Sequence, residues 1–263
     1  MDLDYLLSET IRISKLAGKY IQDERKNFDF SKIEYKGQND LVSYVDKQAE
    51  KLLVENLQSI LPESGFIAEE GTGYEKEINW VIDPLDGTTN FMHGLPPYSV
   101  SIALMKGHDI LLGVIYEITA GECYYAHKHS RAFCDDKPIQ VSNIREFKDG
   151  LYITGYPYRD FSKMDSFYRI MHHFLANSHG LRRFGSAAAD LAYVASGKCE
   201  GFFEFFLSPW DVAAGCLLVQ QAGGIVSDFK GGNDFIFGKE LIAGTFVQPE
   251  MLKIINQYWY PSK

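Results

Sequence analysis

Two stretches near the start of the chain have the apolar spacing of helices. In residues 3–26, and again in residues 42–60, apolar side chains recur every three or four positions, which predicts two helices that each bury one face. Pro62 and Gly65 are expected to end the second helix. The segment 27–40 between them is polar and contains glycine, so it is predicted to be a connection.

The period then changes to that of strands. Residues 66–68 and 80–82 are short apolar runs bounded by turn residues, as buried strands are. Within residues 98–134 several strand-like runs follow one another at intervals of about ten residues. This spacing predicts an antiparallel meander.

Strand and helix patterns alternate in the rest of the chain. Strands are predicted at 151–155, 180–185, 199–206, 225–229 and 240–244, and helices at 164–177, 186–197, 209–224 and 249–258. The alternation indicates an α/β half. We therefore expect an N-terminal α+β half, residues 1–145, with an antiparallel sheet, and a C-terminal α/β half, residues 146–263. No linker separates them, so they are expected to pack intimately.

Composition and charge exclude several classes of protein. Hydrophobic residues make up 46% of 263, enough for a sizeable core. Acidic residues outnumber basic ones by 35 to 26, which argues against nucleic acid and anionic membrane surfaces as partners.

The N-terminal segment does not have the pattern of a signal peptide, and no apolar run has the length of a membrane span. The four cysteines form no CxxC pair, which favours buried thiols in a reducing cytoplasm.

The segment WVIDPLDGTTNF, residues 80–91, carries the strongest chemical signal. A buried strand ends in Asp83, and Asp86 follows after a tight turn, so two carboxylates are expected to converge. The backbone N–H groups of Gly87, Thr88 and Thr89 are suited to a phosphate oxygen. Two carboxylates beside such groups suit a Mg²⁺-dependent phosphate enzyme. An ordinary Asp-Gly turn explains the short motif equally well, and the strand context favours the metal interpretation.

Other carboxylates fit the same interpretation but have ordinary explanations too. Glu69 follows the strand 66–68, yet an exposed Glu-Glu pair is usually solvated. Asp211 lies in a first helical turn, where a carboxylate also stabilises the helix dipole. Glu204 among phenylalanines needs a partner, either a substrate hydroxyl or an arginine.

In their order along the chain, these residues strongly resemble the inositol monophosphatase family of lithium-sensitive, Mg²⁺-dependent sugar phosphatases. The resemblance rests on Asp40 and Asp46, Ala68-Glu69-Glu70, Asp83-Pro84-Leu85-Asp86-Gly87-Thr88-Thr89-Asn90, and Pro209-Trp210-Asp211. It extends from Lys36 to the helix that contains Asp211. It implies an α/β (α+β) fold, the five-layer αβαβα sandwich that is also found in fructose-1,6-bisphosphatase, and a cytoplasmic homodimer.

The resemblance also implies a role for each matching residue. Two or three Mg²⁺ ions, for which Mn²⁺ can substitute, would be held by Glu69, Asp83, the Leu85 carbonyl, Asp86 and Asp211. Glu69 and Thr88 would orient and deprotonate the attacking water, and Asp46 would hold the Thr88 hydroxyl. Substrate would contact Asp86, Gly87, Thr88, Gly185, Ser186, Ala187 and Glu204. Accessory positions are Lys36, Asp40, Arg182 and Arg183, the two arginines being equally compatible with a solvated basic pair.

The expected reaction is hydrolysis of a small phosphate monoester, with myo-inositol monophosphate as the favoured substrate. The same chemistry on fructose 1,6-bisphosphate, a 3′,5′-nucleoside bisphosphate or NADP is a second interpretation. A non-catalytic module that binds metal or sugar phosphate is a third, of a different class. The sequence departs from the commonest family pattern at Ala68, at Ser186 and at the pair Ser208-Pro209, and none of these departures removes a ligand.

Overall fold

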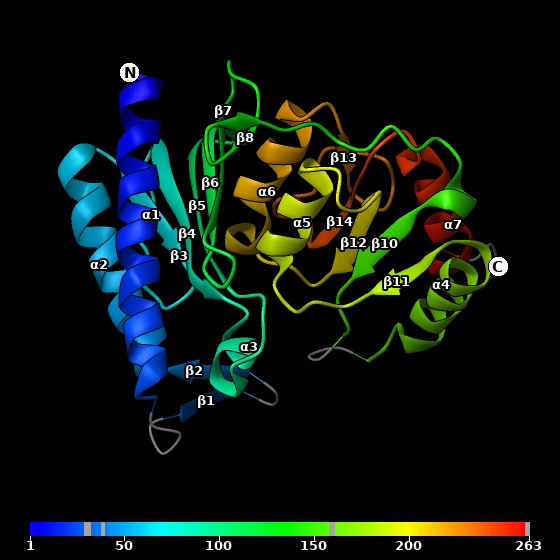
Figure 1. Cartoon of the computed structure of the whole chain (residues 1–263), viewed down its shortest axis with the longest axis horizontal. Coiled ribbons are helices and arrows are strands. Elements are labelled where there is room, and N and C mark those ends of the chain that lie inside the picture. The colour runs from blue at the N-terminus through cyan, green and yellow to red at the C-terminus, as the bar shows by residue number, and fades with distance from the viewer. Residues whose placement is uncertain (29–32, 38–39, 158–160, 261–263) are drawn as a thin grey trace.

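The protein is a five-layer sandwich. The computed structural model describes residues 1–28, 33–37, 40–157 and 161–260, and only the backbone of residues 33–37 and 40–42. Helices α1 (Leu3–Lys26) and α2 (Tyr44–Ile60) form one outer layer, and α4 (Met164–Asn177) and α7 (Gln248–Trp259) form the other. Helices α5 (Ala187–Ala195) and α6 (Pro209–Gln221) lie between two sheets (Figure 1). The predicted αβαβα order is confirmed.

The first sheet has seven strands and follows the chain in order. Its strands are β3 (Gly65–Ala68), β4 (Ile78–Asp86), β5 (Ser99–Lys106), β6 (Asp109–Glu117), β7 (Glu122–His127), β8 (Phe133–Cys134) and β9 (Lys137–Pro138). Only β3 and β4 pair in parallel, and the later pairs are antiparallel, as the predicted meander requires. The short helix α3 (Thr88–His93) lies between β4 and β5.

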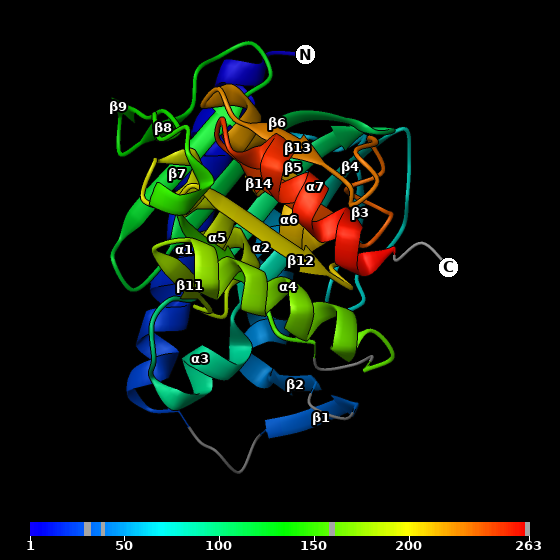
Figure 2. The same cartoon turned by 90° about the vertical axis from the view of Figure 1, so that its right-hand side faces the viewer.

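The second sheet is mixed. Its strands are β10 (Leu151–Thr154), β11 (Gly180–Arg182), β12 (Gly201–Phe205), β13 (Ile225–Ser227) and β14 (Glu240–Gly244), in the order β11-β10-β12-β14-β13. Strand β10 pairs in parallel with β11 and β12, and β14 pairs antiparallel with β12 and β13. Figure 2 shows α4 and α7 lying across the outer face of this sheet.

The segment that was expected to be a connection contains a hairpin. Strands β1 (Ile33–Gly37) and β2 (Asp40–Ser43) pair antiparallel, and α2 begins at Tyr44 rather than at Val42. The Ser43 hydroxyl accepts a hydrogen bond from Val45 N, which fixes the start of the helix. Strands this short hold too few alternating apolar positions to stand out in the sequence, because their stability comes from pairing with each other.

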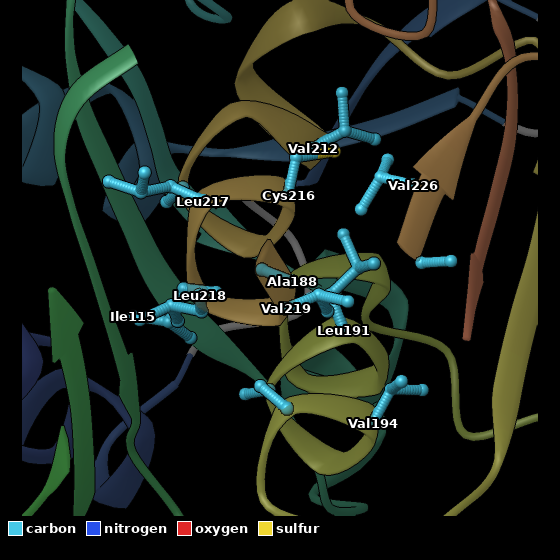
Figure 3. Close-up of a cluster of buried hydrophobic side chains, with 14 of the residues drawn as sticks. Ile115, Ala188, Leu191, Val194, Val212, Cys216, Leu217, Leu218, Val219 and Val226 are labelled. Carbon is cyan, nitrogen blue, oxygen red and sulfur yellow. The ribbon is translucent and has the colours of Figure 1, made fainter. Parts of the chain in front are cut away.

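Helix α6 joins the two sheets into one core. Every residue from Val212 to Val219 is buried, so the helix has no solvent face along this stretch. Figure 3 shows Leu217 and Leu218 on the side of Ile115, which belongs to β6, and Val226 of β13 on the opposite side of the helix. The expected boundary near residue 145 falls between the sheets, but this cluster crosses it. We propose that the two halves fold as one unit.

No helix within the described ranges is long and apolar enough to cross a lipid bilayer.

Gly113 of β6 tests the packing that positions α6. A Cβ at this position would lie 2.9 Å from both Cα and O of Ala214. We expect Gly113→Ala to lower the free energy of unfolding by about 1–3 kcal/mol, because the added methyl enters a closely packed contact. Gly73→Ala is the matched control, since a Cβ there meets nothing within 4 Å. Urea unfolding followed by circular dichroism measures both, and equal stability of the two variants would contradict this packing.

Candidate functional site

A bulge in β4 brings two aspartates to the same cavity. Asp83 pairs with Ser101 of β5 and Asp86 pairs with Ser99, so β4 has one residue more than β5 between these pairs. Residues three apart on a regular strand point to opposite faces, and the extra residue reverses that alternation. Pro84 has no N–H to contribute to the ladder at this point. Leu85 N donates instead to Asp83 Oδ1, at 2.9 Å.

Glu69 and Asp211 reach the same cavity from other elements. Ala68 pairs with Ile82 in the parallel β3–β4 ladder, so Glu69 leaves β3 beside Asp83. Asp211 lies in the first turn of α6, where its Oδ2 accepts a hydrogen bond from Ser208 N at 2.6 Å. The Ser101 hydroxyl donates to the carbonyl of Trp210 at 3.1 Å, which ties the start of α6 to β5.

The cavity has a volume of about 300 Å³ and gathers most of the predicted site residues. Those that line it are Glu69, Asp83, Leu85, Asp86, Gly87, Thr88, Arg183, Gly185, Ser186, Ala187, Glu204 and Asp211. Asp46 lies behind Thr88, and Arg182 is exposed on β11, away from the cavity lining. The side chains of Lys36 and Asp40 lie outside the described residues.

The carboxylates at the cavity repel one another. Burial raises the pKa of Asp83 well above its usual range, and the charges of Glu69, Asp86 and Asp211 raise it further. Burial also raises the pKa of Asp86 to about 6, although hydrogen bonds from Ser186 and from backbone N–H groups oppose this shift. Buried like charges favour protons or cations at the same place. The electrostatics of the site therefore suit divalent metal ions.

The donor chemistry also fits magnesium, because Mg²⁺ binds carboxylate and carbonyl oxygens. Within the described part of the chain, however, no three His, Cys, Asp or Glu side chains have the tight arrangement of a formed metal site. Asp83, Asp86 and Asp211 each have one oxygen that accepts hydrogen bonds from the protein itself. These hydrogen bonds hold the carboxylates in place, and a carboxylate oxygen that accepts one hydrogen bond keeps a lone pair that can bind a cation.

Asp86 also connects the two halves of the protein. Its Oδ2 accepts hydrogen bonds from Ser186 Oγ at 2.6 Å and from Ala188 N at 2.7 Å, both at the start of α5. Ser186 Oγ lies 2.7 Å from Ser99 Oγ as well. Ser186 thus supplies a hydroxyl where the family more often has threonine, and this hydroxyl makes the contacts with both Asp86 and Ser99.

Thr88 and Asp46 form a second buried polar unit. The Thr88 hydroxyl lies 2.9 Å from Asp46 Oδ1 and 3.1 Å from the Leu85 carbonyl, and it can donate to either. Asp46 Oδ2 accepts from both the N–H and the hydroxyl of Ser43. Burial raises the pKa of Asp46, and the hydrogen bonds from Ser43 and Thr88 oppose the shift. The structure thus contains the contact by which Asp46 was expected to hold Thr88.

The backbone before Thr88 requires glycine. Gly87 has φ +92°, in the left-handed region, and a Cβ there would lie 3.1 Å from the carbonyl oxygens of Gly185 and Pro97. The Asn90 side chain holds the same two segments together, since its Nδ2 donates to the carbonyls of Pro97 and Phe184.

Glu204 faces the cavity, and Arg183 lies close enough to affect it. Burial raises the pKa of Glu204 to about 8, the positive charge of Arg183 lowers it, and the charge of Asp86 raises it. The Arg183 guanidinium lies 5.9 Å from the ring centre of Tyr156. A Cβ on Gly155 would collide with the Glu204 carboxylate, so glycine makes room for this side chain.

The sequence analysis did not single out four residues that line the cavity, Gly155, Tyr156, Asp190 and Leu207. A signal for Asp190 was present, because it is the one charged residue in the otherwise small and apolar segment AAADLAYVA. Glu204 had been identified in the same way, as a charged residue among apolar ones. No pattern in the sequence marked Gly155 or Leu207, whose positions depend on tertiary packing.

Comparison with known proteins gives a consistent result. A profile of the inositol monophosphatase family matches residues 2–260. The chain is 40% identical to the putative Nus factor SuhB of Neisseria meningitidis serogroup B, over 96% of this chain and 98% of that protein. It is 36% identical to the inositol-1-monophosphatase of Mesorhizobium japonicum, over 96% of both chains.

A solved structure agrees with these matches. The extragenic suppressor protein suhB from Bartonella henselae superposes with a TM-score of 0.90 and 36% identity, over 96% of this chain and 99% of that one. The family match, the sequence relatives and the fold all cover nearly the whole chain. The chain belongs to the inositol monophosphatase family.

Proposed function

We propose that the protein is a Mg²⁺-dependent phosphatase that hydrolyses the phosphate monoester of a small polyol or sugar. One observation carries the proposal. Four carboxylates from three separate parts of the chain, Glu69, Asp83, Asp86 and Asp211, line one cavity, and their mutual repulsion favours cations there. Buried charges of one sign are costly without a counter-charge, so an ion-binding role accounts for their presence.

The proposed ligands are the Glu69, Asp83, Asp86 and Asp211 carboxylates and the Leu85 carbonyl. When bound, Mg²⁺ would lower the pKa of a water molecule and neutralise the charge of the phosphate. Mn²⁺ has similar ligand preferences and is the proposed substitute.

The protein's own residues would handle the proton of the attacking water. Glu69 and Thr88 both line the cavity, and we propose that they orient the water and remove its proton, which Glu69 accepts directly or Thr88 accepts while its own hydroxyl proton passes to Asp46. Asp46 acts through Thr88, because its Oδ1 lies within hydrogen-bond distance of the hydroxyl and fixes its direction. Phosphate oxygens are proposed to lie against the N–H groups of Gly87 and Thr88.

The rest of the substrate is proposed to occupy the side of the cavity formed by Ser186, Ala187 and Glu204. This side carries a buried carboxylate and one arginine, Arg183, so it suits hydroxyl groups better than a second phosphate. We therefore favour myo-inositol monophosphate over fructose 1,6-bisphosphate, a 3′,5′-nucleoside bisphosphate or NADP.

A regulatory binding module is the second candidate, because several relatives are named Nus factor SuhB rather than after a reaction. Such a module needs neither a water-activating Glu69 nor a Thr88 held by Asp46. The cavity thus favours catalysis. A cytoplasmic homodimer that is inhibited by lithium is proposed on the family resemblance alone.

Asp83→Asn distinguishes the two candidates. We expect wild-type protein with Mg²⁺ to release phosphate from myo-inositol 1-phosphate faster than from any of the bisphosphates or NADP. Asp83→Asn should lower kcat by more than roughly 100-fold, since even residues behind metal ligands typically cost 10- to 100-fold. Asp109→Asn is the matched control, because Asp109 is exposed and pairs with Lys128 on the surface. Identical phosphate release by wild type and Asp83→Asn would favour the binding module.

The carboxyl pKa values make metal binding pH-dependent. In the metal-free protein the pKa of Asp86 is raised from 3.8 to about 6, so the folded state holds this proton more tightly than the unfolded chain does. Its contribution to stability is present below pH 4 and is lost as pH rises through about 6. Protons compete with the metal. The increase in melting temperature on adding Mg²⁺ should therefore be larger at pH 7.5 than at pH 5, and an equal increase would argue against these ligands.

Thr88→Val tests the proton-handling pair. The variant keeps the side-chain shape but removes the hydroxyl that lies 2.9 Å from Asp46 Oδ1. We expect kcat to fall by about 100-fold or more, within the range for loss of acid–base assistance, with little change in KM. Thr88→Ser restores the hydroxyl and should recover most of kcat in the same phosphate-release assay. Equal losses in both variants would show that the hydroxyl does not by itself restore activity, and this result would contradict the proposed role of the hydrogen bond to Asp46.

A further inference from the structure

Asp190 is a buried carboxylate that lines the cavity without a role assigned so far. It lies in the first turn of α5, and its side chain is only 1% exposed. Ser186 and Ala187, four and three positions earlier, also line the cavity, so one face of α5 is turned toward it. Asp190 Oδ1 has no hydrogen-bond partner among the described residues.

The surroundings of Asp190 make the burial of its carboxyl group unfavourable for folding. Burial raises the pKa of Asp190 well above its usual range, the charges of Glu204 and Asp86 raise it further, and Arg183 opposes them. A buried carboxyl oxygen without a partner destabilises a protein in either protonation state, because its hydration is lost and nothing replaces it. A residue of this kind is typical of a functional site rather than of a structural core.

We propose that Asp190 is a specificity-determining residue that contacts the substrate. Oδ1 has almost no accessible surface in this structure, so the carboxyl group rotates to accept a hydrogen bond from one hydroxyl of the leaving alcohol, while Glu204 binds another hydroxyl of the same molecule. The ligand class is a polyol phosphate with at least two free hydroxyl groups. This inference rests on the proposed phosphatase function and extends it by naming the group that selects the substrate.

The position of Asp190 disfavours two other kinds of leaving group. An aryl or alkyl group without hydroxyls would leave the oxygens of Asp190 and Glu204 unpaired in the complex. A second phosphate would bring negative charge next to the carboxyl groups of Asp190 and Glu204. Arg183 is the cation whose charge acts on both of them. A polyol hydroxyl satisfies the unpaired oxygen without adding charge.

The test compares two substrates in the same protein. Wild type, Asp190→Ala and Asp190→Asn are assayed with Mg²⁺ on myo-inositol 1-phosphate, which has free hydroxyls, and on 4-nitrophenyl phosphate, which has none. We expect Asp190→Ala to lower kcat/KM for the inositol substrate by roughly 10- to 100-fold, mainly through KM, the usual effect of losing a hydrogen bond to a charged group. Hydrolysis of 4-nitrophenyl phosphate should not change.

Thermal unfolding supplies a readout that a structural role would not produce. Removal of an unpaired buried carboxyl should leave the melting temperature unchanged or raise it, whereas loss of a structural residue would lower it. Asp190→Asn keeps the shape and one acceptor oxygen, so it should show the same selectivity change to a smaller extent, even if the alanine variant fails to fold. Asp165→Ala, at an exposed position in the first turn of α4, is the control.

The outcomes separate this inference from the proposed function. Equal losses on both substrates, or unchanged selectivity in both Asp190 variants, would overturn the inference while the phosphatase function stands. A wild-type protein that hydrolyses 4-nitrophenyl phosphate without preferring the inositol substrate would overturn it as well. A wild-type protein that hydrolyses neither substrate would overturn the proposed function and this inference together.

Discussion

Repulsion among buried carboxylates is the interaction on which the rest of the site depends. Glu69, Asp86 and Asp211 all raise the pKa of Asp83, and burial removes the water that would otherwise screen them. The fold keeps these groups together because strand pairing and helix packing hold their backbones in place. A site of this kind is unfavourable by itself and becomes favourable when cations enter. The same electrostatics that cost stability therefore supply affinity for metal and phosphate.

Helix N-termini offset part of this cost. Asp46 caps α2 through Ser43, Asp211 accepts from Ser208 at the start of α6, and Asp86 accepts from Ala188 at the start of α5. The N-terminus of a helix carries a partial positive charge, and three such ends converge on the site. Each carboxylate thus has one task at a helix N-terminus and another at the proposed site. For this reason a substitution at these positions is expected to affect both folding and chemistry.

The central helix layer determines how the two halves meet. Helix α6 is buried from Val212 to Val219 and packs on both sheets, so the position of Asp211 relative to Asp83 is set by apolar contacts far from the cavity. The close contact between Gly113 and Ala214 fixes how near α6 lies to the first sheet. The hydrogen bond from Ser101 to the Trp210 carbonyl fixes the start of the helix against β5. The site is therefore a product of the whole sandwich rather than of one loop.

By itself the sequence predicted most of the helices and strands through their periodicity, and its DPLDGTTN and PWDVAAG segments carried the family resemblance that implied the layer order and the acidic residues of the proposed site. It missed the hairpin of β1 and β2, whose strands are too short to show a period. Only the tertiary structure decided that the bulge after Asp83 turns Asp86 to the same side, and that Gly155 makes room for Glu204. It also decided that Asp190, which the sequence marks only as the one charged residue of its segment, lines the cavity with an unpaired oxygen. These features depend on register and on contacts between distant segments, which no local pattern records.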